Sequence, residues 1–256
     1  MVQINFSLKE VNCKIVYYGP GLSGKTTNLE VVHKKAPQTS VGDLTSIATE
    51  GDRTLFFDFL PLNLGQVAGM KTKFQIYTVP GQVYYNSTRK LVLQGADGVV
   101  FVADSKRGKM EENIESLKNL EENLKEHGLS FEKLPVVLQY NKRDLPDVYS
   151  VEELDQELNP GSFPHVEAVA RSGEGVFPTL KKLAGMVLQS LNQQHSSVRG
   201  KSASDTQETT ADSSPSVSAT QDSATAVATK TLVAPKSRAT VARQTRATGV
   251  RRMTTA

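Results

Sequence analysis

Cysteine is almost absent from the sequence, and so are long apolar runs. Cys13 is the one cysteine among 256 residues, which excludes a disulfide within the chain. No apolar stretch approaches the roughly 20 residues that a membrane-spanning helix needs, and the N-terminus lacks the apolar core of a secretion signal. Val2 excludes N-myristoylation, and the ending Met-Thr-Thr-Ala is no prenylation motif. We expect a cytoplasmic protein with at most peripheral membrane contact.

Aromatic residues are missing from the last quarter of the chain. Residues 195–256 contain no Phe, Tyr or Trp and are rich in Ser, Thr and Ala, so they cannot bury enough apolar surface to offset the entropy of folding. We therefore expect a folded domain over residues 1–194 and a disordered tail over residues 195–256.

Positive charge is concentrated in the same tail. It carries nine basic and four acidic residues, a net charge of +5. Since the whole chain has a net charge of +3, residues 1–194 have a net charge of about −2. The basic balance gives no reason to regard the domain as a nucleic-acid binder. The tail also lacks aromatic platforms for base stacking, so nucleic-acid binding ranks low. A solvating appendage and a weak tether to an anionic surface both remain open for it.

One octapeptide stands out in what is present. Residues 19–26 read Gly-Pro-Gly-Leu-Ser-Gly-Lys-Thr and fit the G-x-x-x-x-G-K-[ST] phosphate-binding loop at every fixed position. Gly19, Gly21 and Gly24 let the backbone N–H groups turn inward on a phosphate. Lys25 supplies positive charge for the β- and γ-phosphates, and the hydroxyl of Thr26 can ligate Mg²⁺. A β-rich run over 13–18 precedes the loop and a helical pattern over 25–35 follows it, as this motif requires.

The remaining pattern alternates apolar runs with helical periodicity, which predicts an α/β sheet with helices on both faces. We expect a mobile loop over 37–51 and a hairpin of 54–60 with 71–77, joined through 63–65 and Gly69. The other expected strands are 98–104, 134–140 and 165–169, and the other expected helices are 109–127, 151–158 and 175–191.

A second motif follows the strand at 134–140. Residues 141–144 read Asn-Lys-Arg-Asp, and Asn-Lys-x-Asp after a strand is typical of guanine recognition. A carboxylate at Asp144 can accept from the N1–H and the 2-amino group of guanine together. Adenine offers neither donor there and would leave the charge unpaired, which is costly. Asn141 belongs to the same element, and Lys142 offers its stem to cover the base and its head to brace the first loop.

At this point the chain resembles the Ras-like small GTPases, and in particular the bacterial MglA family of gliding-motility and cell-polarity proteins. The resemblance covers about residues 3–193 and rests on four strings: 14–21 (KIVYYGPG), 52–61 (DRTLFFDFLP), 78–82 (TVPGQ) and 139–146 (QYNKRDLP). It implies a three-layer P-loop NTPase fold, with a mostly parallel six-stranded sheet, one antiparallel edge strand and helices on both faces.

The resemblance also implies roles for single residues. Thr54 would ligate Mg²⁺ and touch the γ-phosphate, the N–H of Gly81 would sense that phosphate, and Gln82 would orient the attacking water. Arg53 would act as an arginine finger supplied by the same chain. Leu22, Ser23 and Thr27 would complete the nucleotide contacts of the first loop.

Two departures from the Ras pattern bear on this site. Thr78 stands where Ras-like proteins carry an aspartate that reaches Mg²⁺ through water, which puts the metal affinity in question. Val169-Ala170-Arg171 replaces the usual Ser-Ala-Lys behind the base, so only the backbone N–H of Ala170 is carried over, as a donor to guanine O6, with Arg171 beside it.

The leading expectation is a switch that binds GTP and GDP with Mg²⁺, hydrolyses GTP slowly and controls polarity or motility at the cell pole or membrane. The family implies a Roadblock-type activating partner, an MglB-like homodimer. A nucleotide-locked binding module without turnover is the alternative. A P-loop kinase or ATPase is disfavoured by Asn141, Lys142 and Asp144.

Overall fold

The computed structural model describes residues 3–5, 8–47, 57–67, 70–82 and 85–202. In this part of the chain one sheet contains the strands β1 (Gln3–Asn5), β2 (Glu10–Tyr18), β3 (Thr45–Ile47), β4 (Phe57–Val67), β5 (Met70–Thr78), β6 (Gly98–Asp104), β7 (Val136–Asn141) and β8 (His165–Glu167). The helices are α1 (Lys25–Lys35), α2 (Asn86–Leu93), α3 (Met110–Glu126), α4 (Val151–Leu158) and α5 (Val176–Ser202).

The strand order is β3-β4-β5-β2-β6-β7-β8, and β1 pairs with β2 off this path. Parallel pairing joins β5, β2, β6, β7 and β8, whereas β4 lies antiparallel to β5. The fold class is confirmed: a mostly parallel sheet with an antiparallel edge. Its strand count is larger than the six expected, because the three-residue strands β3 and β1 add antiparallel pairs on β4 and β2.

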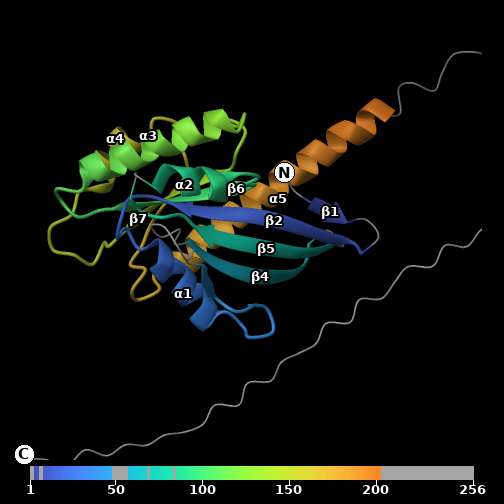
Figure 1. The fold of residues 1–256 in the computed structure, drawn as a ribbon, viewed down its shortest axis with the longest axis horizontal. Coiled ribbons are helices and arrows are strands. Elements are labelled where there is room, and N and C mark those ends of the chain that lie inside the picture. Colours follow the sequence, from blue (N-terminus) through green and yellow to red (C-terminus); the bar gives the residue numbers. More distant parts are fainter. Residues whose placement is uncertain (1–2, 6–7, 48–56, 68–69, 83–84, 203–256) are drawn as a thin grey trace, which may run out of the picture. The chain divides into compact units, whose positions relative to one another are not determined.

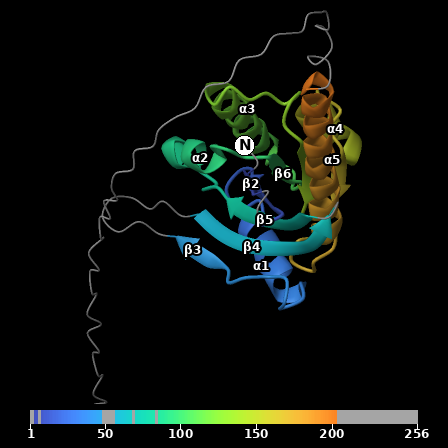
Figure 2. The same ribbon diagram turned by 90° about the vertical axis from the view of Figure 1, so that its right-hand side faces the viewer.

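Alternate residues of β2 show how two helical layers cover the sheet. Ile15 and Tyr17 belong to a core shared with α1 and α5, while Val16 and Tyr18 belong to a second core shared with α2, α3 and α4. Since successive side chains of a strand point to opposite faces, the two cores lie on opposite sides of the sheet. Figures 1 and 2 show α1 on one side of the sheet and α2 and α3 on the other.

Four expectations differ from the structure. Residues 63–65 do not form the hairpin turn: they lie in β4, where the pairing with β5 shifts register between Asn63 and Gln66, and Gly65 adopts φ 79° there. Gly69, the other residue expected in the connection, lies outside the described residues. The expected loop 37–51 contains β3. Helix α2 was not expected, and α5 continues past the expected helix end at Leu191 to Ser202. The compact unit that contains the sheet spans Met1–Gln207.

Within the described residues, none of the helices combines the length and apolarity that crossing a membrane requires.

Candidate nucleotide-binding site

The carboxyl ends of the parallel strands meet at one edge of the sheet, as ligand sites of such sheets require. Residues 19–24 follow β2 there, β5 ends at Thr78, and the paired Asp104 and Asn141 are the last residues of β6 and β7. A pocket of about 800 Å³ opens between this edge and the start of α3, and a pair of smaller pockets, of about 420 and 250 Å³, opens at the edge itself. The two smaller pockets share Leu22, Gly24 and Thr27, so they adjoin across the first loop.

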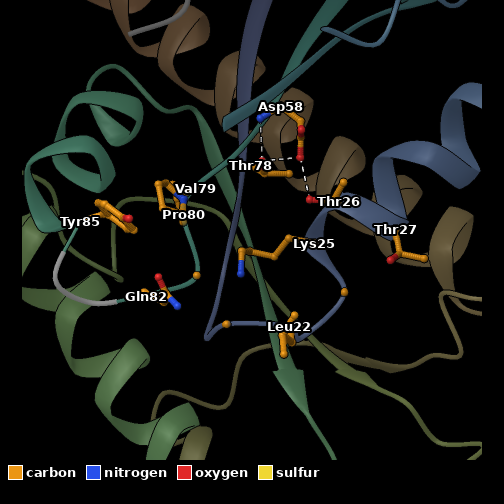
Figure 3. A pocket seen from close by; sticks show the side chains of 13 residues that line it. Leu22, Lys25, Thr26, Thr27, Asp58, Thr78, Val79, Pro80, Gln82 and Tyr85 are labelled. Atoms are coloured by element: carbon orange, nitrogen blue, oxygen red, sulfur yellow. Dashed lines mark hydrogen bonds between the residues drawn. The ribbon is translucent and has the colours of Figure 1, made fainter. Parts of the chain in front are cut away.

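The larger of these two pockets matches the predicted phosphate site (Figure 3). Its lining from the first loop and α1 comprises Gly21, Leu22, Gly24, Lys25, Thr26 and Thr27. Gly19 and Ser23 belong to the loop but stand behind this lining: Ser23 is fully buried, and Gly19 presents its carbonyl to Lys25. Gly81 and Gln82, from the segment after β5, line the same pocket.

Lys25 is the buried cation of the phosphate pocket. Its Nζ donates to the carbonyl oxygens of Gly19, at 3.0 Å, and Pro20, at 2.6 Å. Burial, and to a smaller extent the nearby charge of Arg89, lower the pKa of Lys25 to about 7, and the carboxylate of Asp58 opposes this shift. The loop thus provides its own acceptors for the ammonium group that a phosphate would bind.

The start of α1 explains the last glycine of the motif. Gly24 precedes the helix with φ 103°, a left-handed conformation that residues with a side chain rarely adopt. A Cβ at this position would also lie 2.3 Å from Nδ2 of Asn141. Gly24 therefore lets the helix begin directly beside Asn141 and places the N–H groups of its first turn at the larger pocket, where they could face an anion.

Asp58 of β4 forms the centre of a hydroxyl cluster in the phosphate pocket (Figure 3). Its Oδ2 accepts from the hydroxyls of Thr26, at 2.7 Å, and Thr78, at 2.9 Å, and its Oδ1 accepts from Ser46 at 2.7 Å. The backbone N–H of Asp58 in turn donates to the Thr78 hydroxyl at 2.8 Å. A carboxylate therefore stands beside Thr26 although position 78 has none.

This donor set fits Mg²⁺. The described residues contain no group of three or more His, Cys, Asp or Glu side chains suited to a metal. Mg²⁺ in phosphoryl-transfer sites needs no such group, since one or two protein oxygens, phosphate oxygens and waters suffice. Thr26 and Asp58 offer a hydroxyl and a carboxylate at the mouth of the phosphate pocket, which is adequate for that pattern.

The segment Val79–Gln82 closes the phosphate pocket on the side opposite α1. A Cβ on Gly81 would lie 2.4 Å from Cα of Gly21 and 3.1 Å from Nζ of Lys25. Only a residue without a side chain allows this approach. Gly81 therefore touches the phosphate loop directly, in the region where a terminal phosphate would meet Lys25.

The smaller pocket brings the predicted base-recognition residues together. Its lining comprises Leu22, Gly24, Thr27, Asn141, Lys142, Asp144, Leu145, Ala170 and Arg171. Asn141 links three segments, since its Nδ2 donates to the Ser23 carbonyl at 2.7 Å and its Oδ1 accepts from the Ala170 N–H at 2.8 Å. The N–H expected to reach guanine O6 is thus bonded to Asn141, and a contact with O6 requires that bond to be exchanged.

Lys142 and Asp144 differ in their partners. Lys142 has φ 69° and its Nζ lies 2.5 Å from Oδ2 of Asp104, so its head pairs with that buried carboxylate rather than bracing the first loop. Asp144 is exposed and makes no hydrogen bond or ion pair with the described residues. Its carboxylate is therefore available to a ligand in the pocket.

Two predicted residues, Arg53 and Thr54, lie outside the described residues, so their roles stay predictions. Conversely, Asp58 and Asp104 were missed. A signal for Asp58 existed, since it is the one charged residue in an apolar strand run, residues 55–60 (Leu-Phe-Phe-Asp-Phe-Leu). Asp104 likewise ends a fully buried strand.

Comparison with known proteins decides the family. The profile of the ADP-ribosylation factor (Arf) family matches residues 1–187. The mutual gliding-motility protein MglA of Myxococcus xanthus is 57% identical over 190 residues, which are 74% of this chain and 97% of that protein.

The chain belongs to the MglA family of small GTPases. An uncharacterized protein of Methanocaldococcus jannaschii is a more distant relative, 25% identical over 166 residues, or 65% of this chain and 92% of that protein. The matches to MglA and to the Arf profile agree with the P-loop NTPase fold described above. The name of the Myxococcus xanthus relative refers to gliding motility.

Proposed function

We propose that this chain is a molecular switch that binds guanine nucleotide with Mg²⁺ and hydrolyses GTP to GDP. The observation that carries the proposal is the pair of adjoining pockets, which share Leu22, Gly24 and Thr27. A phosphate chain in the larger pocket and a guanine in the smaller one would be joined across the first loop. The family membership supports the same nucleotide.

In this proposal the bound phosphates replace the loop carbonyls as hydrogen-bond acceptors of Lys25. Its Nζ exchanges the carbonyls of Gly19 and Pro20 for β- and γ-phosphate oxygens, while the N–H groups at the start of α1 face the same anion. Anionic oxygens are stronger acceptors for an ammonium group than neutral carbonyls are, so the exchange is favourable.

Mg²⁺ would be held by Thr26 and Asp58, with Thr54 as a further ligand from the sequence prediction. The ion supplies charge neutralisation at the β- and γ-oxygens. Asp58 replaces, from the neighbouring strand, the carboxylate that Ras-like proteins carry at the position of Thr78. The bonds from Thr26 and Thr78 to Asp58 support this assignment, because they place the carboxylate beside both residues.

Guanine selectivity would come from Asp144, which has a carboxylate open to the smaller pocket. Guanine covers that carboxylate with two N–H donors, while adenine leaves it unpaired. Asn141 ties the base segment to Ser23 of the phosphate loop, so base and phosphate binding are mechanically linked.

The switch itself would be the segment that contains Gly81 and Gln82. Gly81 lies against Gly21 in this structure, and a γ-phosphate must enter the same region beside Lys25. GTP therefore has to displace this segment, whereas GDP does not. Effectors that contact it would distinguish the two nucleotides, with Gln82 and Arg53 completing the catalytic geometry in the GTP form.

Turnover would be slow alone, on the order of 10⁻⁴–10⁻² s⁻¹ for this enzyme class, and faster with a Roadblock-type, MglB-like homodimer. The name of the Myxococcus xanthus relative points to gliding motility, so we propose control of polarity or motility through state-dependent effectors. The protein would work in the cytoplasm and reach the cell pole or membrane through the seven basic residues between Lys230 and Arg252.

Single-turnover hydrolysis of bound GTP, with and without that partner, tests the proposal. We expect Gln82→Ala and Arg53→Ala each to lower the stimulated rate while GTP affinity stays near that of the parent. A parent that holds GTP without hydrolysing it under either condition would establish the nucleotide-locked alternative.

A further inference from the structure

Arg89 of α2 is a fully buried arginine without an ion-pair partner among the described residues. Burying a charged guanidinium is unfavourable unless its donors are satisfied. Here Nε donates to the carbonyl of Pro80 at 2.9 Å and Nη2 donates to the carbonyl of Gly81 at 2.6 Å. The charge is therefore directed at two consecutive carbonyls of the segment that covers the phosphate loop.

A polar network fixes the guanidinium from behind. Nη1 of Arg89 donates to Oδ1 of Asn119 at 2.8 Å, and the guanidinium lies 5.0 Å from the ring centre of Tyr18. The Tyr18 hydroxyl donates to the same Asn119 oxygen at 2.6 Å, and Asn123 donates to that hydroxyl at 2.9 Å. Asn119 of α3 and Tyr18 of β2 thus hold the Arg89 guanidinium in place, and the segment with Pro80 and Gly81 can move relative to it.

The two carbonyl contacts determine how the following N–H groups point. A peptide group is planar, and in the trans form its C=O and N–H point in opposite directions. The carbonyl of Pro80 shares a peptide plane with the N–H of Gly81, and the carbonyl of Gly81 shares one with the N–H of Gln82. By holding both carbonyls, Arg89 turns these two N–H groups away from α2.

On the other side of this segment stands the phosphate loop. Gly81 packs against Gly21 and lies close to Nζ of Lys25, as described above. In Figure 3 the backbone between Pro80 and Gln82 runs between Tyr85 and Lys25. An N–H directed away from Arg89 would then lie on the side where a terminal phosphate would meet Lys25.

We propose that Arg89 is a positioning residue that orients the Gly81 N–H toward the γ-phosphate and so makes the site sensitive to GTP rather than GDP. The inference rests on the proposed GTPase function. When a γ-phosphate separates Gly81 from Gly21, the carbonyls of Pro80 and Gly81 stay on Arg89 and the segment turns about them. GDP has no γ-phosphate, so its binding does not depend on this alignment.

The test compares affinities for fluorescent GDP and a fluorescent non-hydrolysable GTP analogue, with Mg²⁺ and the full chain. Arg89→Lys keeps the charge, but one ammonium group cannot reproduce the planar fork across both carbonyls and Asn119. Arg89→Met keeps much of the volume and removes every donor. Lys90→Met is the matched control, because Lys90 is the next residue of α2 and pairs with Glu126 at the surface.

For both Arg89 variants we expect GDP affinity within about threefold of the parent and affinity for the GTP analogue lower by about tenfold or more, which corresponds to 1.4 kcal/mol. Lys90→Met should change neither. Equal losses for both nucleotides, or failure of both Arg89 variants to fold, would make Arg89 a purely structural residue and overturn the proposal.

Unchanged affinities in variants of a nucleotide-binding parent would refute the role of Arg89 and leave the GTPase proposal intact. A parent that binds neither nucleotide would refute both. If Arg89→Met alone fails to fold, Arg89→Lys decides the question through the same two affinities.

Discussion

Replacing Asp58 by asparagine separates the metal from the rest of the nucleotide site. The substitution keeps the size of the side chain and one acceptor oxygen but removes the negative charge beside Thr26. Carboxylates that support a metal site typically contribute 10–100-fold to metal affinity. We expect the variant to bind GDP almost as the parent does in EDTA and to lose at least about tenfold of the affinity that Mg²⁺ adds.

Stability changes as well and must be kept apart from the metal effect. Three hydroxyls donate to Asp58, from Thr26, Thr78 and Ser46. A hydrogen bond to a charged group contributes about 1 kcal/mol more than one to a neutral group, so the empty protein should lose up to about 3 kcal/mol of unfolding free energy. The part of this loss that comes from Ser46 and Thr78 acts equally with and without metal, so the ratio of GDP affinities in Mg²⁺ and in EDTA cancels it.

Two further variants sharpen the Asp58 test. Ser46→Ala removes one donor to Asp58 but no charge, so the Mg²⁺ enhancement should equal that of the parent. Adding Thr78→Asp to Asp58→Asn returns a carboxylate to the neighbouring strand position and should restore part of the enhancement, while Thr78→Asp alone sets two carboxylates against each other and should destabilise the fold. An Asp58→Asn variant with the parent's full Mg²⁺ enhancement would show that Asp58 does not serve the metal.

Three more predictions follow from the site and the tail. Asp144→Ala should weaken GDP binding more than tenfold, which corresponds to about 1.4 kcal/mol. The affinities for GDP and ADP are compared by competition, and a parent with equal affinity for the two nucleotides would contradict guanine selectivity. Because the pKa of Lys25 is lowered to about 7, chiefly by burial, the empty site loses this positive charge above that pH, whereas bound phosphates favour the charged form. GDP affinity should therefore fall by up to tenfold per pH unit between about pH 7.5 and 9. The affinity of Lys25→Arg should depend less on pH, because arginine stays charged. The same pH dependence in the parent and in Lys25→Arg would show that Lys25 does not cause it. A chain that ends at Gln207, the end of the compact unit, should bind nucleotide like the full chain but sediment less with anionic vesicles at low salt. Equal sedimentation would leave the tail a solvating segment as far as lipid is concerned.

Local sequence signals predicted most elements of the fold. The stretch 25–35 has no Gly or Pro, and Pro37 follows it, so α1 has the bounds expected. Helix α2 could not be anticipated in the same way, because its eight residues are too short for a clear period and its start at Asn86 carries no side-chain cap. Gly65 favoured a turn, yet the pairing of β4 with β5 absorbs it as an irregularity inside the strand.

For the site too, local sequence signals predicted some residues, while others depend on tertiary packing. Residues of the first loop and of 141–144 could be recognised because each motif is contiguous in sequence, and the structure brings them to adjoining pockets. Asp58 shows in the sequence only as a charged residue in an apolar run, and Arg89 carries no such signal, because the partners of both residues are set by tertiary packing. Asp58 meets Thr78 through the pairing of β4 with β5, and Arg89 meets Pro80 and Asn119 only once α2 packs against α3.

The two bonds between Lys25 and its own loop have a consequence for how quickly the protein can be reloaded. When a nucleotide leaves, Lys25 can donate to the carbonyls of Gly19 and Pro20, so its buried ammonium group keeps two hydrogen-bond acceptors in the empty site. The free-energy gap between the emptied and the filled protein is smaller as a result, and net affinity is lower than the phosphate contacts alone would give. If the chain exchanges nucleotide as proposed, the emptied chain would be an intermediate of that exchange, and its lifetime would set the time window in which the cellular ratio of GTP to GDP determines the next occupant.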